Sequence, residues 1–320
     1  MGKKILMIRT LNNFNNPQGR LIFRINLPFL HFCFFTLLQS LFEFIMQNLR
    51  PVIDDFSFEK ISQFITKNYG IKLDQSKRSL VESRLGSRVR SLNFDSYHSY
   101  LGYVFQRNNK SELNLLVDLI TTNKTDFFRE PSHFNFLTEY LLPDFVKHYG
   151  QNINIWSSAC SSGEEVYTLA MVLDDYSRKY RLTYNISGSD LSYQMLEQAK
   201  AGVYHLNRLG PIPEEYKKRY MLKSKNPKQH LARFKPEIRN KVVFYQRNLM
   251  EPNYGNQKFH VIFCRNVLIY FDKQKQEEVV NRLARQLHQG GYLFLGHSES
   301  VLGMKVDITQ IQPTIYRKLL

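Results

Sequence analysis

Hydrophobic positions after residue 150 follow two alternating patterns along the chain. Short apolar runs predict buried strands at 153–156, 182–189, 242–245, 259–264, 292–295 and 314–318. Between several of these runs, apolar residues three or four positions apart predict amphipathic helices, including 164–175 and 276–286. Strands that alternate with helices favour an α/β fold with a mostly parallel sheet. Its ligand is then expected at the carboxyl edge of the strands.

The stretch 152–170, NINIWSSACSSGEEVYTLA, joins the first of these strands to a helix through small residues that end at Gly163. Such a loop lets a ligand approach the backbone, and the helix N-terminus presents unpaired N–H groups to it. An ordinary tight turn is the alternative. Asp190 stands at the tip of the second strand, where an acid can accept hydrogen bonds from ribose hydroxyls. Taken alone, Asp190 would more often be the N-cap of the next helix.

Residues 51–120 are predicted to form a helical domain. Apolar residues recur at helical spacing, Gly70 suits a helix C-cap, and Asp74 can N-cap a helix that runs to about Arg90. The segment 121–130, TTNKTDFFRE, is first polar and then aromatic. It shows neither the helical nor the strand period of apolar residues, so it suits a linker held against a ligand site. Prolines and basic residues at 203–240 interrupt the later alternation and indicate an inserted excursion with a small antiparallel piece.

The first 50 residues follow a different pattern. The segment 27–45 is apolar, follows several basic residues and is nearly long enough to cross a bilayer, but polar residues and Pro28 interrupt it. Met46 precedes a sequence that resembles the start of a soluble protein. Two interpretations stay open: an upstream extension that is not translated, or a helix that binds a membrane or a partner.

The net charge of the chain indicates the class of its partner. The chain of 320 residues has a formal net charge of +16, so an acidic partner is expected: nucleic acid, membrane surface or protein. Lys77, Arg84 and Arg88 share one face of a predicted helix, which is either a docking face or an ordinary solvated one. Three scattered cysteines fit a reducing compartment and lack zinc-ligand spacing, so no metal is expected.

Motif absences narrow the chemistry further. The chain has no P-loop lysine motif, no three-glycine dinucleotide fingerprint and no Gly-x-Ser-x-Gly elbow. What remains is a nucleoside site with one ribose acid and few ionisable catalytic groups. Methyl transfer from S-adenosylmethionine suits such a site, because the sulfonium already activates the methyl group and the protein mainly holds donor and acceptor in line.

Four motifs carry a family resemblance: TTNKTDFFRE (121–130), WSSACSSGEEVYTLA (156–170), CRNVLIYFD (264–272) and GHSE (296–299). With them, residues 54–318 resemble the chemotaxis receptor methyltransferase (CheR) family of protein-glutamate O-methyltransferases. The resemblance implies a helical receptor-docking domain at 51–120 and a linker at 121–150 that contributes to the donor site. It also implies a Rossmann-like S-adenosylmethionine-dependent methyltransferase domain at 151–320, with a small inserted β-subdomain at about 203–240.

The same resemblance implies site residues. Arg129 and Tyr270 would position the incoming carboxylate. The donor would be bound by Asn123, Thr125, Arg129, Glu165, Asp190, Asn248, Leu249, Asn266 and Val267. The chain departs from the family pattern at two places. Val166 stands where a proline is common, and the loop varies at Cys160–Ser162. Neither departure removes a polar group needed for binding.

The implied partners are acidic methylation helices of chemoreceptors, with Lys77, Arg84 and Arg88 as docking residues. A cytoplasmic monomer is expected, which binds no nucleic acid and meets the membrane only through the receptor. The loop 224–229 of the insert lacks glycine, which puts binding of a receptor tail peptide in doubt. A nucleic-acid methyltransferase is the alternative enzyme, although Arg265-Asn266-Val267-Leu268 replaces its usual Asn/Asp-Pro-Pro-aromatic run. A non-catalytic receptor-array adaptor is the other alternative.

Overall fold

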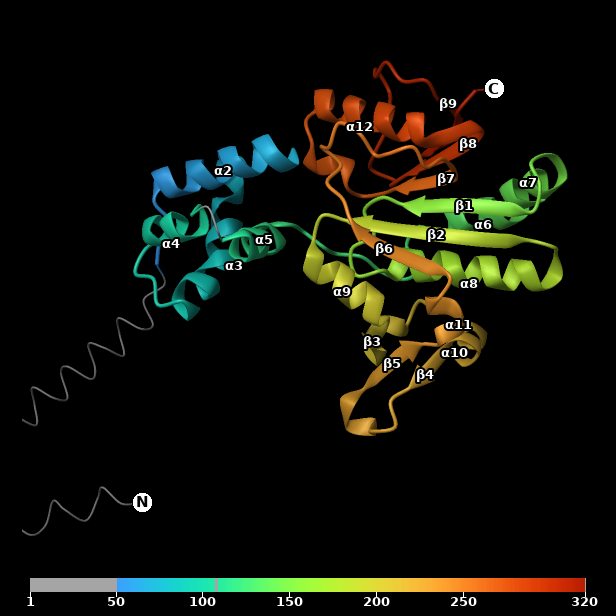
Figure 1. Ribbon diagram of the computed structural model, residues 1–320, viewed down its shortest axis with the longest axis horizontal. Helices are drawn as coiled ribbons and strands as arrows, with labels where there is room; N and C mark the ends of the chain where they lie inside the picture. Colours follow the sequence, from blue (N-terminus) through green and yellow to red (C-terminus); the bar gives the residue numbers. More distant parts are fainter. Residues whose placement is uncertain (1–50, 107–108, 320) are drawn as a thin grey trace, which may run out of the picture. The chain divides into compact units, whose positions relative to one another are not determined.

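The structure is a computed structural model that describes residues 51–106 and 109–319 (Figure 1). Both interpretations of residues 1–50, as an untranslated extension or as a membrane or partner helix, therefore concern residues outside the described part. Within 51–106 and 109–319, no helix combines the length and the apolar character that crossing a bilayer requires.

The N-terminal part of the described chain is all helical. Its elements are α2 (Asp55–Tyr69), η1 (Gln75–Lys77), α3 (Arg78–Ser91), α4 (Tyr97–Val104) and α5 (Lys110–Ile120). Gly70 ends α2 in the left-handed region at φ 75°, as its predicted C-cap role requires. Asp74 caps the short 3₁₀ turn η1 by accepting from the Ser76 N–H, so the α-helix itself begins only at Arg78. Phe58, Val81 and Tyr100 belong to the core that these helices share.

Three short helical segments form the second half of the linker 121–150 and lead to the sheet: α6 (Ser132–Phe136), the π-helical turn η2 (Leu137–Leu141) and α7 (Leu142–His148). The sheet has the strand order β6-β2-β1-β7-β8-β10-β9. Its strands are β1 (Asn152–Ser157), β2 (Thr183–Asp190), β6 (Val242–Gln246), β7 (Phe259–Cys264), β8 (Leu287–Leu295), β9 (Thr309–Gln312) and β10 (Ile315–Arg317).

The first five strands in that order are parallel, and β10 and β9 add an antiparallel edge. This confirms the mostly parallel sheet. β9 was not predicted, because its four residues are all exposed at the sheet edge and give no apolar alternation.

Both faces of the sheet are buried. In β7, Val261 and Phe263 join the core cluster that contains residues of α8 (Glu164–Lys179), whereas Ile262 and Cys264 join the cluster of α12 (Lys273–Gln286). Because each face is covered, β7 is apolar at nearly every position, as expected of a central parallel strand. Figure 1 shows α8 and α12 on opposite sides of the strands.

The strand order creates a crevice beside β1. On one side of β1 lies β2, and β6 lies next to β2. The chain then returns across the sheet, so β7 lies on the other side of β1. Ser157, at the end of β1, is in register with Gly188 of β2 and with Phe263 of β7. The loops after β1 and β7 therefore leave the sheet in different directions, and ligands of open α/β sheets bind at such a switch point.

The predicted insertion forms a second sheet, β3-β5-β4, whose strands are all antiparallel. It contains β3 (Val203–His205), η3 (Leu206–Leu209), α10 (Glu214–Tyr220), β4 (Met221–Lys223), η4 (Pro227–Gln229), β5 (Leu231–Phe234) and α11 (Pro236–Arg239), and it follows α9 (Tyr193–Ala201). Phe234 of β5 stacks on Tyr167 of α8 with 4.3 Å between ring centroids. We call residues 203–240 the insert; it is packed against the main domain.

The ring of His260 on β7 generates a prediction about stability and pH. Its Nδ1 accepts from the Asn154 N–H at 2.9 Å, and its ring stacks on His288 with 4.4 Å between centroids. Burial, with a smaller contribution from His288, lowers the pKa of His260 to about 4. The unfolded chain, with a histidine pKa near 6.5, therefore binds more protons than the folded one between those values. Folding stability consequently falls as the pH falls through this window.

We expect His260→Asn, which keeps an acceptor near the Nδ1 position, to reduce this loss. The free energy of unfolding should decrease between pH 7.5 and 5.5 by about 1 kcal/mol less than in the unmodified chain. Guanidinium unfolding at the two pH values measures the difference. His230→Asn, at an exposed histidine, is the matched control. An equal pH dependence in all three proteins would contradict the prediction.

Candidate functional site

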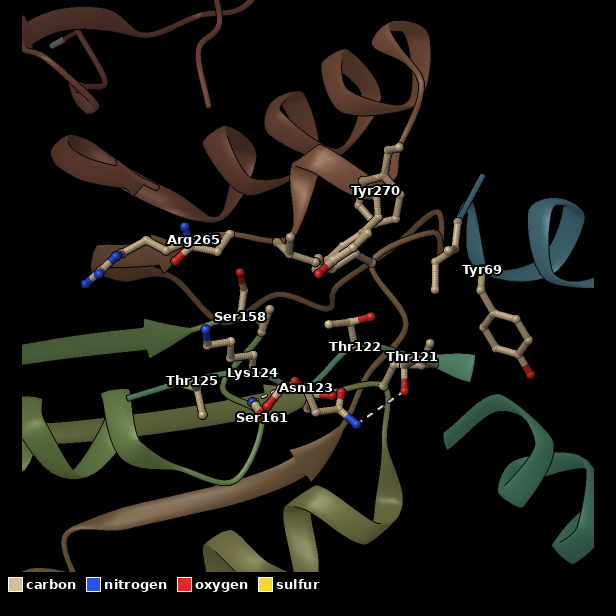
Figure 2. Close-up of a pocket in the computed structure, with 18 of the residues that line it drawn as sticks. Tyr69, Thr121, Thr122, Asn123, Lys124, Thr125, Ser158, Ser161, Arg265 and Tyr270 are labelled. Carbon is tan, nitrogen blue, oxygen red and sulfur yellow. Dashed lines mark hydrogen bonds between the residues drawn. The ribbon is translucent and has the colours of Figure 1, made fainter. Parts of the chain in front are cut away.

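A cavity of about 170 Å³ lies at the carboxyl edge of the main sheet (Figure 2). Its lining comes from the helical part (the ends of α2 and α5 and the start of α3), the linker, the loop after β1 with the start of α8, the tip of β2, and the segments after β6 and β7. The residues predicted to bind the donor or the carboxylate all line it: Asn123, Thr125, Arg129, Glu165, Asp190, Asn248, Leu249, Asn266, Val267 and Tyr270. Glu165 and Asp190, in particular, share one cavity.

Asp190 holds the loop after β1 in place. One carboxylate oxygen accepts from the Ser161 N–H at 2.7 Å and the other from the Ser192 N–H at 3.0 Å. Helix α9 is capped by Ser192, which accepts from the Met195 N–H, so Asp190 is not the cap of that helix. Burial raises the pKa of Asp190, and its backbone hydrogen bonds oppose this rise. The carboxylate is thus fixed at the cavity wall, where it can accept further hydrogen bonds.

Glu165 lies in the first turn of α8 and also faces the cavity. Its Oε1 accepts from the Ser157 hydroxyl at 2.7 Å, and its Oε2 lies 3.4 Å from Nη1 of Arg265. Burial raises the pKa of Glu165, while Arg265 acts in the opposite direction. Gly163 makes this helix start possible: its φ is 95°, and a Cβ there would lie 2.9 Å from the Ala199 Cβ.

Arg265 connects β7 to the linker. The guanidinium is buried, forms an ion pair with Glu130 at 3.2 Å and donates to the Arg129 carbonyl. It also lies over the Phe134 ring, 5.6 Å from the centroid. Burial opposes ionisation of Glu130, but Arg265 and the surrounding hydrogen bonds outweigh it and lower the pKa of that carboxyl. The backbone at Arg129 is therefore anchored, and the Arg129 guanidinium donates to the Lys124 carbonyl at 3.2 Å.

Glu299 of the GHSE motif shapes the turn after β7. Its buried carboxylate accepts from the backbone N–H groups of Asn266, Val267, Leu268 and Gly296 at 2.6–2.8 Å. The Asn266 side-chain amide donates to Glu130 at 3.2 Å. The backbone N–H groups of residues 266 and 267 and the Asn266 side-chain amide are thus already engaged within the protein.

Backbone strain is concentrated around the cavity. Of seven described non-glycine residues with positive φ, four lie in the linker and the loops that border the site: Phe128, Glu130, Ser161 and Asn266. Such conformations cost free energy and persist where surrounding contacts enforce them, often at functional sites. Here the enforcing contacts include the bond from the Ser161 hydroxyl to the Asn123 carbonyl at 2.9 Å.

The helical part closes one side of the cavity. The Asn248 amide donates to the Asn68 carbonyl at 2.8 Å, and the Lys72 N–H donates to the Tyr270 carbonyl at 3.0 Å. Tyr270 comes from the 3₁₀ turn η5 (Leu268–Tyr270), and Figure 2 shows its ring across from Thr122 of the linker. Because the Asn248 side chain is used in this way, its predicted donor contact would have to come from other atoms of the residue.

The three predicted docking residues differ in their surroundings. Lys77 is exposed and lines the cavity. Arg88 binds the buried Glu112 through two hydrogen bonds of 2.9 and 2.6 Å, and Arg84 donates to the carbonyls of Ile120 and Thr121. Arg84 and Arg88 thus have internal partners in the helical part, and their docking role stays a prediction.

Glu130, His133 and His297 have potential metal-ligand atoms within 4.8 Å of one another. His133 is buried, its Nε2 lies 2.8 Å from the Thr314 hydroxyl, and burial lowers its pKa to about 4. The charge of Glu130 is already compensated by Arg265. The expectation that the protein needs no metal stays a prediction.

Sequence reasoning assigned no role to several residues that build this site: Glu130, Glu164, Arg208, Arg265 and Glu299. Four of them, Glu130, Glu164, Arg265 and Glu299, lie within the quoted motifs, so their place in a motif was the available signal. Arg208 lies in the insert and carried no such signal.

Comparison with known proteins agrees with this arrangement. The family described as "CheR methyltransferase, SAM binding domain" matches residues 123–317, and "CheR methyltransferase, all-alpha domain" matches residues 57–121. A chemotaxis protein methyltransferase of Borreliella burgdorferi is 34% identical over 279 residues, which are 85% of this chain and 97% of that protein.

Two further relatives carry the same description. The Salmonella typhimurium protein is 35% identical over 83% of this chain and 91% of its own length. The Vibrio anguillarum protein is 37% identical over 83% of this chain and 98% of its own length. The matched S-adenosylmethionine-binding domain contains the whole lining of the cavity from Asn123 onwards. The chain belongs to the CheR family and is an S-adenosylmethionine-dependent chemotaxis protein methyltransferase.

Proposed function

We propose that this enzyme methylates glutamate side chains on the cytoplasmic methylation helices of chemoreceptors and forms glutamate methyl esters. The observation that carries the proposal is the position of Arg129 and Tyr270 in the same cavity as Glu165 and Asp190. A cation and a phenol beside the donor site suit an acceptor that is a carboxylate. The chemotaxis relatives support a receptor as the protein that supplies this carboxylate.

The donor is assigned to the cavity by the chemistry of its lining. Asp190 would accept from the ribose hydroxyls, as an acid at the tip of the second strand does in related folds. Glu165 is the acidic group next to the loop, suited to the positively charged aminoacyl end of the donor. Asn123 and Thr125 would contact the donor from the linker, and Asn248, Leu249, Asn266 and Val267 would surround the adenosine.

The proposed mechanism needs orientation more than proton transfer. A glutamate side chain, with a reference pKa near 4.3, is already an anion at pH 7 and needs no general base. Bound S-adenosylmethionine supplies a methyl group activated by its sulfonium. Arg129 or Tyr270 holds one carboxylate oxygen so that the other attacks in line. The carboxylate oxygen would form a bond to the methyl carbon as the sulfur–methyl bond breaks with its electron pair left on sulfur, so the products would be a glutamate methyl ester and S-adenosylhomocysteine.

Docking is proposed to use the basic helical part. Lys77 is exposed at the cavity and can attract an acidic helix, which then presents its glutamate to Arg129. We infer that the enzyme works as a cytoplasmic monomer, binds no nucleic acid, and reaches the membrane only through its receptor. Residues 51–120 would form the docking domain, 121–150 the linker, and 151–320 the methyltransferase domain.

The substrate class can be tested by methyl transfer from tritiated S-adenosylmethionine to a receptor cytoplasmic fragment, RNA and DNA in parallel. We expect label on the receptor fragment that mild base releases as methanol, because a carboxyl ester is base-labile. Base-stable label, or label on nucleic acid alone, would reject the glutamate proposal. Absence of label from all three substrates would favour the non-catalytic adaptor.

Arg129→Ala tests carboxylate orientation. If Arg129 orients the acceptor through charge-assisted hydrogen bonds, turnover should fall at least tenfold while donor affinity changes little. Single-turnover kinetics with receptor fragment and calorimetry with S-adenosylhomocysteine measure the two effects. Arg178→Ala, at an arginine near the end of α8 that is half-exposed and bonded to Asp174, is a matched control. Unchanged turnover in Arg129→Ala would eliminate the proposed role.

Lys77→Glu tests docking without breaking an internal ion pair. At low salt, we expect the KM for the receptor fragment to increase about threefold or more. This increase should become smaller at high ionic strength, because salt screens surface charges. Lys67→Glu, at an exposed residue in the last turn of α2, is the control for the change in net charge. A KM for Lys77→Glu equal to that of Lys67→Glu at every salt concentration would argue against docking through Lys77.

A further inference from the structure

Two side chains of the insert hold the segments that border the donor site. The Tyr204 hydroxyl donates to the Ser162 carbonyl at 2.6 Å. The Arg208 guanidinium donates to the Thr125 carbonyl at 2.6 Å and to Glu164 at 2.8 Å. Ser162 and Glu164 stand on either side of Gly163 at the start of α8, and Thr125 belongs to the linker. The insert therefore binds both walls of the cavity at this corner.

The burial of Glu164 makes its contact with Arg208 important for stability. Its side chain is fully buried, and its second carboxylate oxygen accepts from the Ser162 hydroxyl at 2.7 Å. Burial raises the pKa of Glu164, and the Ser162 bond and the Arg208 charge oppose that rise. A buried carboxylate is costly unless a cation and hydrogen bonds compensate it. Arg208 of the insert supplies that cation to Glu164. The next residue along α8 is Glu165, whose carboxylate faces the cavity.

Aromatic packing supports the same junction. Phe127 of the linker is buried and packs edge-on against Tyr204, with 5.0 Å between ring centroids. It also lies 5.9 Å from the Phe234 ring. The linker is thus attached to the insert on both sides of Asp126: by the Thr125 carbonyl before it and by the Phe127 ring after it. The next two anchors come from the main domain: the Phe128 N–H donates to the Thr168 hydroxyl of α8 at 3.2 Å, and the Arg129 carbonyl is held by Arg265.

We propose that Arg208 is a positioning residue for the methyl donor and that the insert is a structural part of the donor site. Arg208 fixes the distance between Thr125 and the first turn of α8, and so sets the position of Thr125 relative to Glu165. The proposal rests on the placement of S-adenosylmethionine in this cavity. On the acceptor side, the Arg129 carbonyl keeps its bond to Arg265 when Arg208 is changed, and the Arg129 guanidinium bonds to the Lys124 carbonyl beside Thr125.

Calorimetry with S-adenosylmethionine and S-adenosylhomocysteine on the full chain tests the proposal. Arg208→Ala removes the bonds to both Thr125 and Glu164, so the linker is no longer held against α8, and the Kd of both ligands should rise about tenfold. Turnover at saturating donor should fall by a smaller factor than the Kd rises, so the larger change should appear in the KM for the donor. Arg208→Lys keeps the charge near Glu164 but lacks the planar fork that reaches two acceptors at once, and should give an intermediate Kd.

Arg233→Ala is the matched control, because Arg233 lies in β5 of the same insert and bonds to the Ala201 carbonyl, away from the cavity lining. Tyr204→Phe removes one hydrogen bond and keeps the ring, so it should raise the Kd about threefold even if Arg208→Ala fails to fold. Unchanged Kd values in Arg208→Lys and Tyr204→Phe, or an equal effect in Arg233→Ala, would overturn the proposal. Failure of the unmodified chain to bind either ligand would instead reject the placement of the donor.

Discussion

The buried guanidinium of Arg265 is the interaction on which the site depends. It lies between Glu130 of the linker and Glu165 of α8, and it donates to the Arg129 carbonyl. A buried cation must be compensated at short range, and removing one partner leaves the others uncompensated. Since the partners come from separate segments, their charges are satisfied together only when the linker, α8 and the end of β7 meet. The ion cluster therefore specifies one arrangement of the cavity.

Two other buried carboxylates organise the rest of the rim in the same way. Glu299 collects four backbone N–H groups and so determines the turn after β7, where Asn266 has positive φ. Glu164 pairs with Arg208 and brings in the insert. Carboxylates that accept hydrogen bonds from fixed donors can hold strained loops without a large apolar core beneath them. The loops can therefore stay short and still present polar groups to a ligand.

This organisation matches the demands of methyl transfer. With an activated methyl group and the proposed carboxylate acceptor, the protein's task is alignment, for which rigid positioning matters more than a tuned acid or base. The linker is fixed at Thr125, Phe127 and Arg129, and the helical part reaches the cavity through the bonds of Asn248 and Lys72. The donor site and the proposed acceptor and docking surfaces thus share one connected set of contacts.

The sequence by itself determined the elements that local pattern controls. The apolar run 259–264 became β7 with those same bounds, and the polar insertion formed an antiparallel sheet. Glu165 follows the small-residue loop after β1 and Asp190 ends β2, so both lie at one edge of the sheet. Periodicity reports which face is buried, and topology then brings the carboxyl ends of parallel strands together. Motifs identified the family and the residues of the cavity.

Only the tertiary structure decided which charged groups meet. The basic face of α3 gave no sign that Arg88 would pair with Glu112, or that Arg84 would bind the carbonyls at the end of α5. Nor did the sequence indicate that Arg208 would reach Glu164, or that the exposed strand β9 would extend the sheet. Pairing of charges and edge strands depends on distances between segments far apart in the chain, which local periodicity does not encode.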